Sequence, residues 1–418
     1  MIKTMNIESL KENLEPGRLW SDLMTLGAIG VTPRGGSSRV ALSDADRDAR
    51  NLFVYWAKEA GMTIKVDRIG NIFARREGQE PELPPVMVGS HLDTQTPGGK
   101  FDGILGVLAG LEVVRAMNRS KLSFRRSVEV AVWTNEEGVR FPGLMGSSVF
   151  AKLKSVDQAL SDVDKNGISV ATELKRIGYA GKEPVGGRAL DSYIELHIEQ
   201  GALLEKANVT IGAVTNSSWW AIGNLTVHGS NGHAQTAPMS HRKNALYGAA
   251  QLISQIEQVG LNHEPHGMVS VTEIECLPNN MINLPHYCNL KYLIVHDTEA
   301  GRSQIIKQIT DIIATVKQET GLLVDDDSEL SLDRLDFSPE LLELTESAAE
   351  SMGYKSMRLS TLTGHDALQM HHVCPTAIIF VPCEGGLSHC EEEWCSEEHV
   401  TAGAQVLLAA VASRAGTV

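Results

Sequence analysis

Five side chains of the types that bind divalent metal ions stand in short polar segments spread along the chain. They are His91, Asp102, Glu137, His197 and His389. Imidazole and carboxylate ligands suit zinc, and they also suit manganese and cobalt. Any one such residue alone is more often an ordinary hydrogen-bonded side chain, whereas the set has the composition that two ions sharing one carboxylate require. The sequence therefore predicts a centre of two divalent ions, with zinc as the expected metal.

The expected division of these ligands follows from that stoichiometry. Asp102 is the expected bridge between the two ions. The pairs expected to complete the two ions are His91 with His197, and Glu137 with His389.

A second acidic residue, Glu136, stands directly beside the ligand Glu137. Adjacent side chains at a strand end diverge, so one carboxylate can hold metal while its neighbour faces a water molecule. A general base must come within about 2.6 to 3.2 Å of that water, whose pKa a metal lowers to roughly 7. We therefore expect Glu136 to be the general base, with a solvated acidic turn as the alternative. Asp93 is expected to accept the second N–H of His91 and fix its tautomer.

These side chains need a scaffold in which strand ends converge. Residues 43–62 have apolar side chains at helical spacing, and a glycine near the end of this range suits a helix C-cap. Two strand-like runs, a buried apolar strand, a helical run of small residues and another strand follow at 63–67, 72–74, 85–89, 103–117 and 127–134. This alternation indicates an α/β fold. His91 and the two glutamates follow predicted strands, where open α/β sheets usually bind ligands.

A change in the pattern of predicted strands and helices near residue 216 indicates an inserted α+β domain. The elements predicted there are strands at 221–227, 268–275 and 288–296 and helices at 241–259 and 301–320. An acidic run at 325–329 marks the expected exit, and a helix at 339–352 and a strand at 376–381 then return to the α/β pattern. We therefore expect a discontinuous metal-binding catalytic domain at 1–215 and 328–418, with the smaller domain at 216–327.

Composition and charge narrow the classes of partner. The formal net charge of −15 argues against nucleic acid, whose binding requires clustered Lys and Arg. No run of about 20 apolar residues could span a membrane, and the first residues lack the features of a secretory signal, so the cytoplasm is the expected location. The six cysteines include no Cys-x-x-Cys pair and indicate neither a disulfide framework nor a zinc knuckle.

Several motifs follow one another in a fixed order. They are Gly-Ser-His-Leu-Asp-Thr at 89–94, Gly-Gly-Lys-Phe-Asp-Gly at 98–103, Trp-Thr-Asn-Glu-Glu-Gly at 133–138, Glu-Leu-His-Ile-Glu-Gln-Gly at 195–201 and Gly-Gly-Leu-Ser-His at 385–389. Over roughly residues 20 to 410 the chain resembles the amidase and carbamoylase branch of the M20 metallopeptidase family. That branch includes N-carbamoyl-L-amino-acid hydrolases, allantoate amidohydrolases and ureidopropionases. The resemblance implies the metal and base roles given above, a zinc-peptidase-like catalytic domain with an inserted dimerisation or lid domain, and a homodimer.

The activity that the resemblance implies is hydrolysis of a linear amide or ureido (N-carbamoyl) C–N bond in a small molecule. A metal-bound hydroxide would attack the carbonyl, with Glu136 as general base. By the same resemblance Gln200, His233 and Asn283 bind substrate. His233 would also stabilise the tetrahedral intermediate and is able to reach the site from the partner subunit. For Asn283, a turn residue before Pro285 is the alternative.

Departures from the family pattern, among them Gln235 where relatives usually have glycine, leave the substrate open. Relatives that bind an α-carboxylate carry Asp-x-Arg on the lid strand, because a guanidinium fork holds a carboxylate with two hydrogen bonds. Here Val295 stands in the arginine register, or His296 if the register slips by one residue. Segment 361–364 reads Thr-Leu-Thr-Gly where relatives commonly have Ser-Gly-Ala-Gly, which adds bulk to a substrate-facing loop. Two other functions remain open: an M20 aminoacylase or dipeptidase, and a non-catalytic metal-dependent ligand-binding protein.

Overall fold

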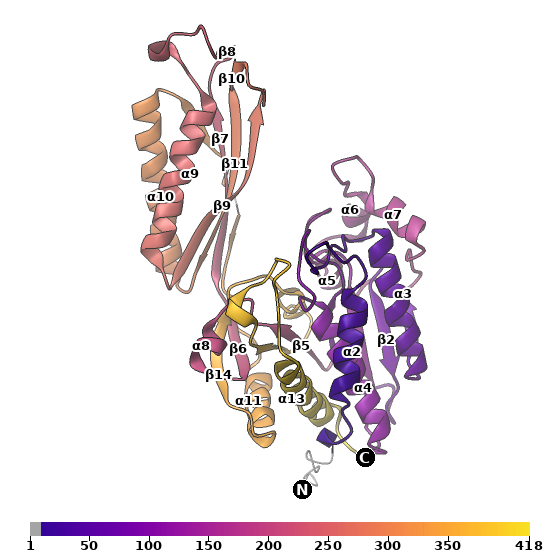
Figure 1. Cartoon of the computed structure of the whole chain (residues 1–418). Helices are drawn as coiled ribbons and strands as arrows, with labels where there is room; N and C mark the ends of the chain where they lie inside the picture. Colours follow the sequence, from indigo (N-terminus) through magenta and orange to yellow (C-terminus); the bar gives the residue numbers. More distant parts are fainter. Residues whose placement is uncertain (1–9, 329) are drawn as a thin grey trace. The chain divides into compact units, whose positions relative to one another are not determined.

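The computed structural model describes residues 10–328 and 330–418 and divides the chain into two units (Figure 1). The first unit comprises the chain up to Thr215 together with Phe337–Val418, and the second unit is Asn216–Asp336. The chain leaves the first unit and returns to it side by side. The backbone N–H of Phe337 donates to the carbonyl of Thr215 (2.9 Å), and Asn216 forms a β-bridge with Asp336.

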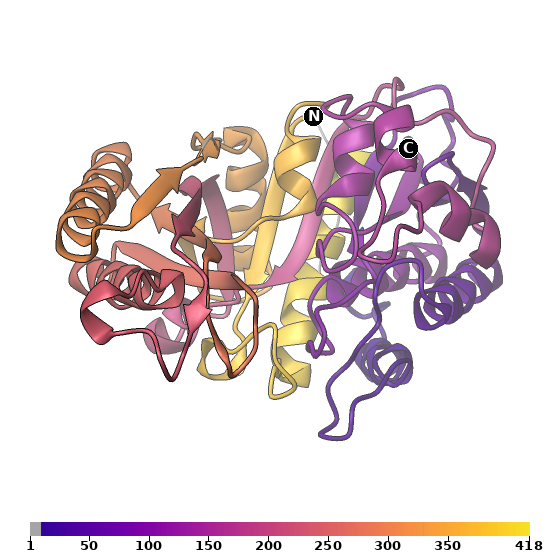
Figure 2. The same ribbon diagram turned by 90° about the horizontal axis from the view of Figure 1, so that it is seen from above.

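An eight-stranded sheet forms the centre of the first unit. Its strand order is β1-β2-β4-β3-β5-β15-β6-β14. The strands are β1 (Thr63–Val66), β2 (Ile72–Arg76), β3 (Val86–His91), β4 (Val128–Trp133), β5 (Ser192–Ile198), β6 (Ile211–Ser217), β14 (Ser356–Thr361) and β15 (Thr376–Val381). Strands β4, β3, β5 and β15 run parallel, and β5 and β15 lie side by side although far apart in sequence (Figure 2). Every residue of these four strands is buried, as expected of parallel strands covered on both faces.

Two helices that are apolar on almost every side pack against each other and against this sheet. They are α4 (Ile104–Arg119) and α13 (Glu397–Ala415). The other α-helices of this unit are α2 (Pro16–Gly27), α3 (Asp44–Glu59), α5 (Met145–Phe150), α6 (Val156–Ser161), α7 (Val170–Ile177), α8 (Leu203–Ala207), α11 (Pro339–Ser351) and α12 (Asp366–Met370). The Ser43 side chain caps α3 by accepting from the backbone N–H of Asp46, which explains where the predicted helix at 43–62 begins.

The second unit is an antiparallel sheet with two helices on one face (Figure 1). Its strand order is β12-β7-β11-β9, with β13 also paired to β7. The elements are β7 (Trp219–His228), β9 (Gly267–Leu277), β11 (Tyr287–His296), β12 (Leu323–Asp326), β13 (Leu330–Leu332), α9 (Ala245–His263) and α10 (Glu299–Thr320). One face of the sheet and the facing sides of α9 and α10 form its core. A separate ribbon pairs β8 (Gly232–His233) with β10 (Asn283–Leu284).

Two boundaries differ from the sequence-based prediction. The second unit ends at Asp336 rather than at 327, because β13 lies beyond the acidic run and pairs with β7. Helix α9 begins at Ala245 rather than at 241, because Asn244 caps it by accepting from the N–H of Leu246. Among the described residues, every helix is too short or too polar to cross a bilayer.

Candidate metal centre

Four parallel strands deliver the predicted ligands to one edge of the sheet. His91 is the last residue of β3, Glu137 follows the end of β4, and His197 is the penultimate residue of β5. His389 lies in the segment between β15 and α13, and Asp102 lies just before α4. The carboxyl edge of the parallel strands is where ligands usually bind in open α/β sheets.

The first cluster of possible ligands is His91, Asp102 and His197, all buried. Asp102 Oδ1 lies 3.0 Å from His197 Nε2 and 3.6 Å from His91 Nε2. Gly103 must be a glycine here, because its φ is +68° and an added Cβ would lie 2.4 Å from the His91 ring. At these distances the ligand atoms of the three side chains can all face one common point.

The second cluster uses the other oxygen of the same aspartate. It consists of Asp102, Glu137 and His389. His389 Nε2 lies 3.1 Å from Asp102 Oδ2 and 3.5 Å from Glu137 Oε2. Gln95 holds Glu137 in place, donating from its side-chain amide to Oε2 (2.7 Å) and from its backbone N–H to Oε1 (3.0 Å). The two clusters therefore share Asp102, as two ions bridged by one carboxylate require.

The hydrogen bonds of the imidazoles show that these side chains fit a cation. Nδ1 of His91 lies 2.9 Å from the carbonyl oxygen of Asp93, and Nδ1 of His197 lies 2.9 Å from that of Ile198. A carbonyl only accepts, so each Nδ1 carries a proton, and Nε2 is the nitrogen that faces Asp102 and can take up a proton or a metal ion there. Two acceptors facing each other at 3.0 Å need a positive charge between them, which a proton or a divalent ion can supply.

The surrounding charges are predominantly negative. Among the described residues, the only ion-pair partners of Asp102, Glu136 and Glu137 are the three imidazoles. Burial raises the pKa of Glu136 well above its usual value, and burial together with Asp102 raises the pKa of Glu137 to about 7. Although burial opposes it, hydrogen bonds from the imidazoles hold the pKa of Asp102 well below its usual value. A divalent cation would relieve this excess of negative charge.

Glu136 lies beside the first cluster without belonging to either. Its Oε2 is 3.6 Å from His91 Nε2, and its side chain is only 10% exposed. Asn135 has a φ of +55°, and this left-handed residue turns the chain between β4 and the two glutamates. The carboxylate is therefore available to exchange a proton with a molecule held at the clusters.

Asp93 contacts both halves of the site, but with atoms other than those predicted. Its backbone carbonyl, rather than its carboxylate, faces His91 Nδ1, because the carboxylate Oδ1 is 3.9 Å away. The carboxylate instead accepts from the backbone N–H groups of Glu136 (3.3 Å) and Glu137 (3.1 Å). Asp93 thus fixes the turn that carries the expected base and one expected ligand.

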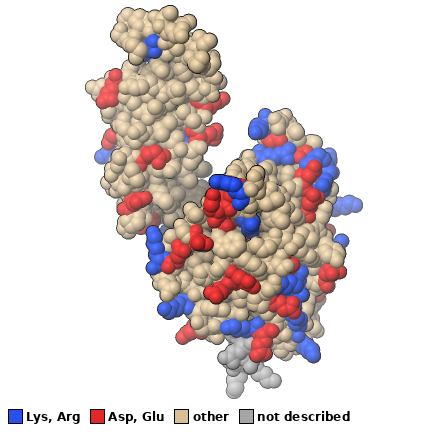
Figure 3. Space-filling model, viewed as in Figure 1, with Lys and Arg blue, Asp and Glu red and all other residues tan. Residues whose placement is uncertain are grey.

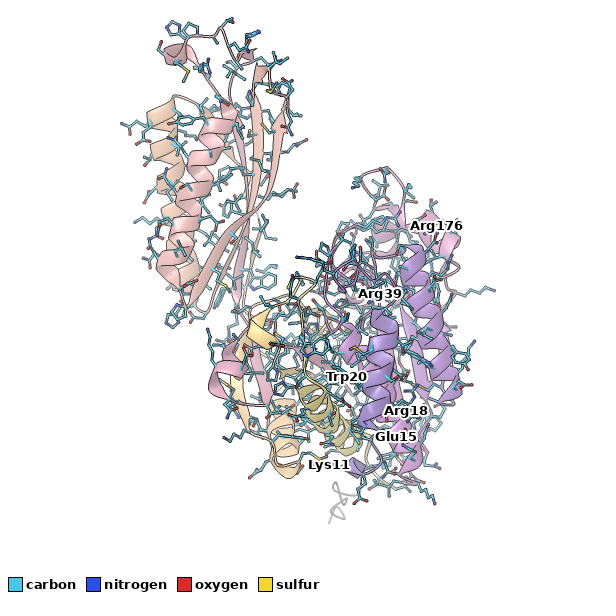
Figure 4. The ribbon with its side chains drawn as sticks, in the orientation of Figure 1. Lys11, Glu15, Arg18, Trp20, Arg39 and Arg176 are labelled. Carbon is cyan, nitrogen blue, oxygen red and sulfur yellow. The ribbon has the colours of Figure 1, made fainter. Side chains whose placement is uncertain are left out.

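A fully buried arginine, Arg39, which is labelled in Figure 4, supports the same segment. Arg39 donates from Nε to the carbonyl of Leu92 (2.6 Å) and from Nη1 to the carbonyl of Ile29 (2.8 Å) and to Ser37 Oγ (3.0 Å). Its backbone N–H donates to Thr94 Oγ1 (2.8 Å). Burial lowers the pKa of Arg39 to about 10. Nothing in the sequence around Arg39 marked it as part of the site.

Gln200, which the sequence predicted to bind substrate, lies beside the two clusters with its side-chain amide turned towards Asp102. Its Nε2 donates to Asp102 Oδ2 (2.9 Å) and to Ser388 Oγ (3.1 Å), and its Oε1 accepts from Thr363 Oγ1 (2.8 Å). Glu393, also unpredicted, is buried and accepts from Ser388 Oγ (2.8 Å). The run of three glutamates at 391–393 gave no sign of which one turns inwards.

The other two predicted substrate residues lie in the second unit as direct cross-strand neighbours. His233 on β8 pairs with Asn283 on β10, and both are exposed. Nδ1 of His233 accepts from the backbone N–H of Gln235 (3.2 Å), so its neutral ring carries the proton on Nε2. Arg242 orders this loop by donating to the carbonyls of Ala234 and Ala237. His233 is therefore poised as a hydrogen-bond donor.

At the two positions of strand β11 that the sequence singled out for binding a substrate carboxylate, the structure shows no positively charged side chain. Val295 is buried and pairs with Trp220, on the face away from the helices. His296 turns towards the helices, where an added Cβ at Gly301 would lie 2.0 Å from its ring. Burial lowers the pKa of His296, so it is neutral near pH 7. Neither residue replaces a guanidinium fork.

On the face shown in Figure 3, acidic and basic side chains of the first unit are interspersed rather than gathered by sign. The neighbouring arginines Arg125 and Arg126 pair with Glu80 and Asp191. These guanidinium groups are therefore already neutralised.

Comparisons with known proteins identify the family of this chain. The model of peptidase family M20/M25/M40 matches residues 87–413. An N-carbamoyl-L-amino-acid amidohydrolase of Rhizobium meliloti is 40% identical over 397 residues, covering 94% of this chain and 95% of that protein. A ureidoglycolate hydrolase of Arabidopsis thaliana is 31% identical, covering 97% of this chain and 87% of that protein. The crystal structure of an amidase of the hydantoinase/carbamoylase family from Burkholderia vietnamiensis matches with a TM-score of 0.92 and 40% identity, over 96% of this chain and 98% of that one.

These matches confirm the family resemblance, the α/β fold class and the enzyme class predicted from the sequence. The chain belongs to peptidase family M20/M25/M40 and, within it, to the amidohydrolases.

Proposed function

We propose that this enzyme hydrolyses a linear amide or ureido C–N bond of a small molecule with two divalent ions, and that zinc is the native metal, with manganese or cobalt as substitutes. The observation that carries the proposal is the shared use of Asp102 by two three-residue clusters. The carboxylate of Glu136 adjoins them without contributing to either. One bridging acid, two terminal ligands for each ion and a separate base is the composition that metal-assisted hydrolysis requires.

Two divalent ions would be held by Asp102 with His91 and His197 on one side and with Glu137 and His389 on the other, and they would supply polarisation of the scissile carbonyl and a lowered pKa of water. Glu136 takes a proton from that water and returns it to the leaving nitrogen, as a general base that becomes a general acid. Its burial and raised pKa suit it to hold the proton between the two steps. Arg39 holds the backbone of Leu92, next to His91, and Asp93 holds the backbone N–H of Glu136, so Glu136 stays beside the clusters.

We propose that the second unit acts as a lid that brings His233 and Asn283 to the substrate. The Nε2 proton of His233 would donate to the oxyanion that develops on the carbonyl. Asn283, directly across the ribbon, offers an amide to the same small molecule. The ordering of the loop by Arg242 supports this role, because a preorganised donor loses little entropy when substrate binds.

We further propose a homodimer formed through strand β9. Among the described residues this 11-residue strand pairs only with β11, so no strand covers its other edge. Met268, Ile274 and Leu277 on this strand are 47%, 49% and 44% exposed. A long edge strand with exposed apolar side chains readily adds a strand from a second copy. Size-exclusion chromatography with light scattering should report a dimer. The double substitution Met268→Lys and Ile274→Lys should shift the protein towards monomer.

Two observations narrow the substrate class: the compounds in the names of the relatives, and the side chains at the end of strand β11. The ureido compounds named for the relatives make a ureido group the first choice for the scissile bond. Because Val295 and His296 supply no guanidinium fork, we propose that binding depends little on a substrate α-carboxylate.

The test is a matched panel of ureido and N-acyl compounds, each with and without a carboxylate, assayed after loading with zinc, manganese or cobalt and again after chelation. We expect metal-dependent release of ammonia from ureido compounds, with kcat/KM changing less than tenfold when the carboxylate is removed. Preference for N-acyl compounds would instead favour an aminoacylase or dipeptidase. Metal binding without turnover of any compound would favour a ligand-binding protein.

A further inference from the structure

Two cysteines of the second unit face each other across neighbouring strands. Cys276, near the end of β9, and Cys288, near the start of β11, are direct cross-strand partners in the antiparallel register. The S–H of Cys288 donates to the sulfur of Cys276, and the two Sγ atoms are 3.2 Å apart. All six cysteines of the chain are free thiols. The two sulfur atoms of this pair are therefore in contact but not bonded.

The backbone positions of the pair suit a disulfide. Directly opposed residues of antiparallel strands have Cα atoms about 4.5 to 5.5 Å apart. A disulfide joins residues whose Cα atoms are about 4.4 to 6.8 Å apart. The register of Cys276 and Cys288 thus already meets the requirement on the backbone. Small rotations of the two side chains can close the bond while both strands stay in place.

The two thiols differ in burial, which gives them different roles in such a reaction. Cys288 belongs to the hydrophobic core of the second unit and is fully buried, whereas Cys276 packs against that core and is half-buried. Burial, together with the hydrogen bond to Cys276, raises the pKa of Cys288 to about 12, so this thiol keeps its proton near pH 7. Cys276 is therefore the sulfur that a small molecule from solvent reaches first.

The pair also brackets a short segment of the chain, residues 277–287. This segment carries Asn283 on β10, and Met281 within it is 93% exposed. At its base the backbone N–H of His286 donates to the carbonyl of Leu277 (2.9 Å), directly beside the two cysteines. A bond between the cysteines would close the same base covalently. The mobility of the segment would then depend on the oxidation state of the pair.

We propose that Cys276 and Cys288 are a redox site, which forms a reversible disulfide and thereby restrains the segment that carries Asn283. The oxidant is a small disulfide such as oxidised glutathione. The Cys276 thiolate attacks one sulfur of this molecule, which forms a mixed disulfide and releases one thiol that takes up the Cys276 proton. The Cys288 sulfur then attacks the sulfur of Cys276, and the second small thiol leaves with the Cys288 proton. Two protein thiols are oxidised, and one small disulfide is reduced to two thiols.

The test treats the full-length protein with oxidised glutathione and maps its peptides by mass spectrometry without reduction. We expect the wild type to give a peptide pair linked through Cys276 and Cys288, which excess reduced glutathione separates again. The substitution Cys288→Ala should leave one glutathione on Cys276, because the second thiol is missing. The matched control is Cys390→Ala, because Cys390 is also a half-buried free thiol but lies in the first unit. This control should form the link as the wild type does.

Hydrogen exchange of the backbone amides measures the restraint on the segment. In the chain-entropy account, a link that closes a loop of this length disfavours opening of the whole loop about 100-fold. We therefore expect amides within residues 277–287 to exchange at least about 10-fold more slowly in the oxidised wild type than in the reduced protein. Amides of α13 in the first unit should exchange at unchanged rates. In Cys276→Ala the same treatment should leave exchange within 277–287 unchanged.

Three results would overturn the inference. The first is wild-type protein in which Cys276 and Cys288 stay unlinked, whether both remain thiols or Cys276 retains glutathione. The second is a link between the Cys276 residues of two chains, which a gel run without reductant would show as a dimer. The third is a Cys276–Cys288 link that leaves exchange within residues 277–287 unchanged. These results do not depend on metal binding or hydrolysis, so they are distinct from a failure of the proposed function.

Discussion

Replacing the buried Arg39 with methionine tests whether the metal centre is held from behind. Methionine has a similar length and no donor, so the change removes three bonds of 3.0 Å or shorter, to Leu92, Ile29 and Ser37. A hydrogen bond to a charged group contributes about 1.5 to 3 kcal/mol, and a buried carbonyl left without a donor costs about 1 to 3 kcal/mol. Relief from burying a guanidinium, whose Nη2 already lacks a partner, offsets part of this loss. We therefore expect Arg39→Met to lower the free energy of unfolding by about 4 kcal/mol, a large share of the roughly 5 to 15 kcal/mol typical of a domain.

The measurement is urea denaturation followed by circular dichroism, with metal content determined on the same samples. Arg47→Met is the control, because the ion pairs of Arg47 with Asp44 and Asp48 are exposed and should change the free energy of unfolding by less than about 0.5 kcal/mol. Zinc affinity should also fall in Arg39→Met, since Leu92 directly follows the ligand His91. If Arg39→Met unfolds within about 0.5 kcal/mol of the wild type, the assignment of Arg39 as the support of this segment is wrong.

Further predictions concern the base, one ligand, the metal and the lid. Glu136→Gln keeps the shape but removes the proton acceptor, so kcat should fall about 10²- to 10⁴-fold with metal content near normal; turnover close to wild type would remove Glu136 from the mechanism. Glu137→Gln should instead reduce the bound metal, by atomic absorption, from two ions to one per chain, and retention of two ions would contradict the ligand assignment. Restoring zinc to chelated protein at 100 times its dissociation constant should stabilise the first unit by about 2.7 kcal/mol per site in calorimetry, and an unchanged melting temperature would argue against a site in the folded state. Asn283→Ala should raise KM while leaving zinc affinity unaltered, and a changed zinc affinity would place Asn283 outside the role of substrate ligand.

Three of the four parallel strands, β3, β4 and β15, could be predicted from the sequence because they are short apolar runs, whereas β5, which carries His197, was not predicted as a strand. Helices α2 and α13 were not predicted. Helix α13 carries Ala, Val and Leu on almost every side, so it lacks the one-sided apolar periodicity by which an amphipathic helix is recognised. The end of the second unit was misplaced because β13 is short and follows a run of acidic residues that reads as a linker.

For the site, residue types and motif order indicated which side chains gather, but not which atoms meet. Asp93 was expected to face His91 with its carboxylate, whereas its carbonyl does so. Arg39 and Glu393 went unnoticed, and Thr363 was noted only for the bulk of its loop, because each acts through hydrogen bonds to segments far away in the chain. Such pairings depend on the completed fold, and no local spacing reports them.

The paired exit and return of the chain at Thr215 and Phe337 has a consequence for how such enzymes can diversify. The 121-residue stretch Asn216–Asp336, here called the cassette, is attached to the first unit at two neighbouring backbone positions. A tight turn from 215 to 337 would close the parent sheet without moving any of the five expected metal ligands, all of which lie outside the cassette. Exchange of the cassette can therefore alter recognition and assembly while the hydrolytic machinery is inherited intact.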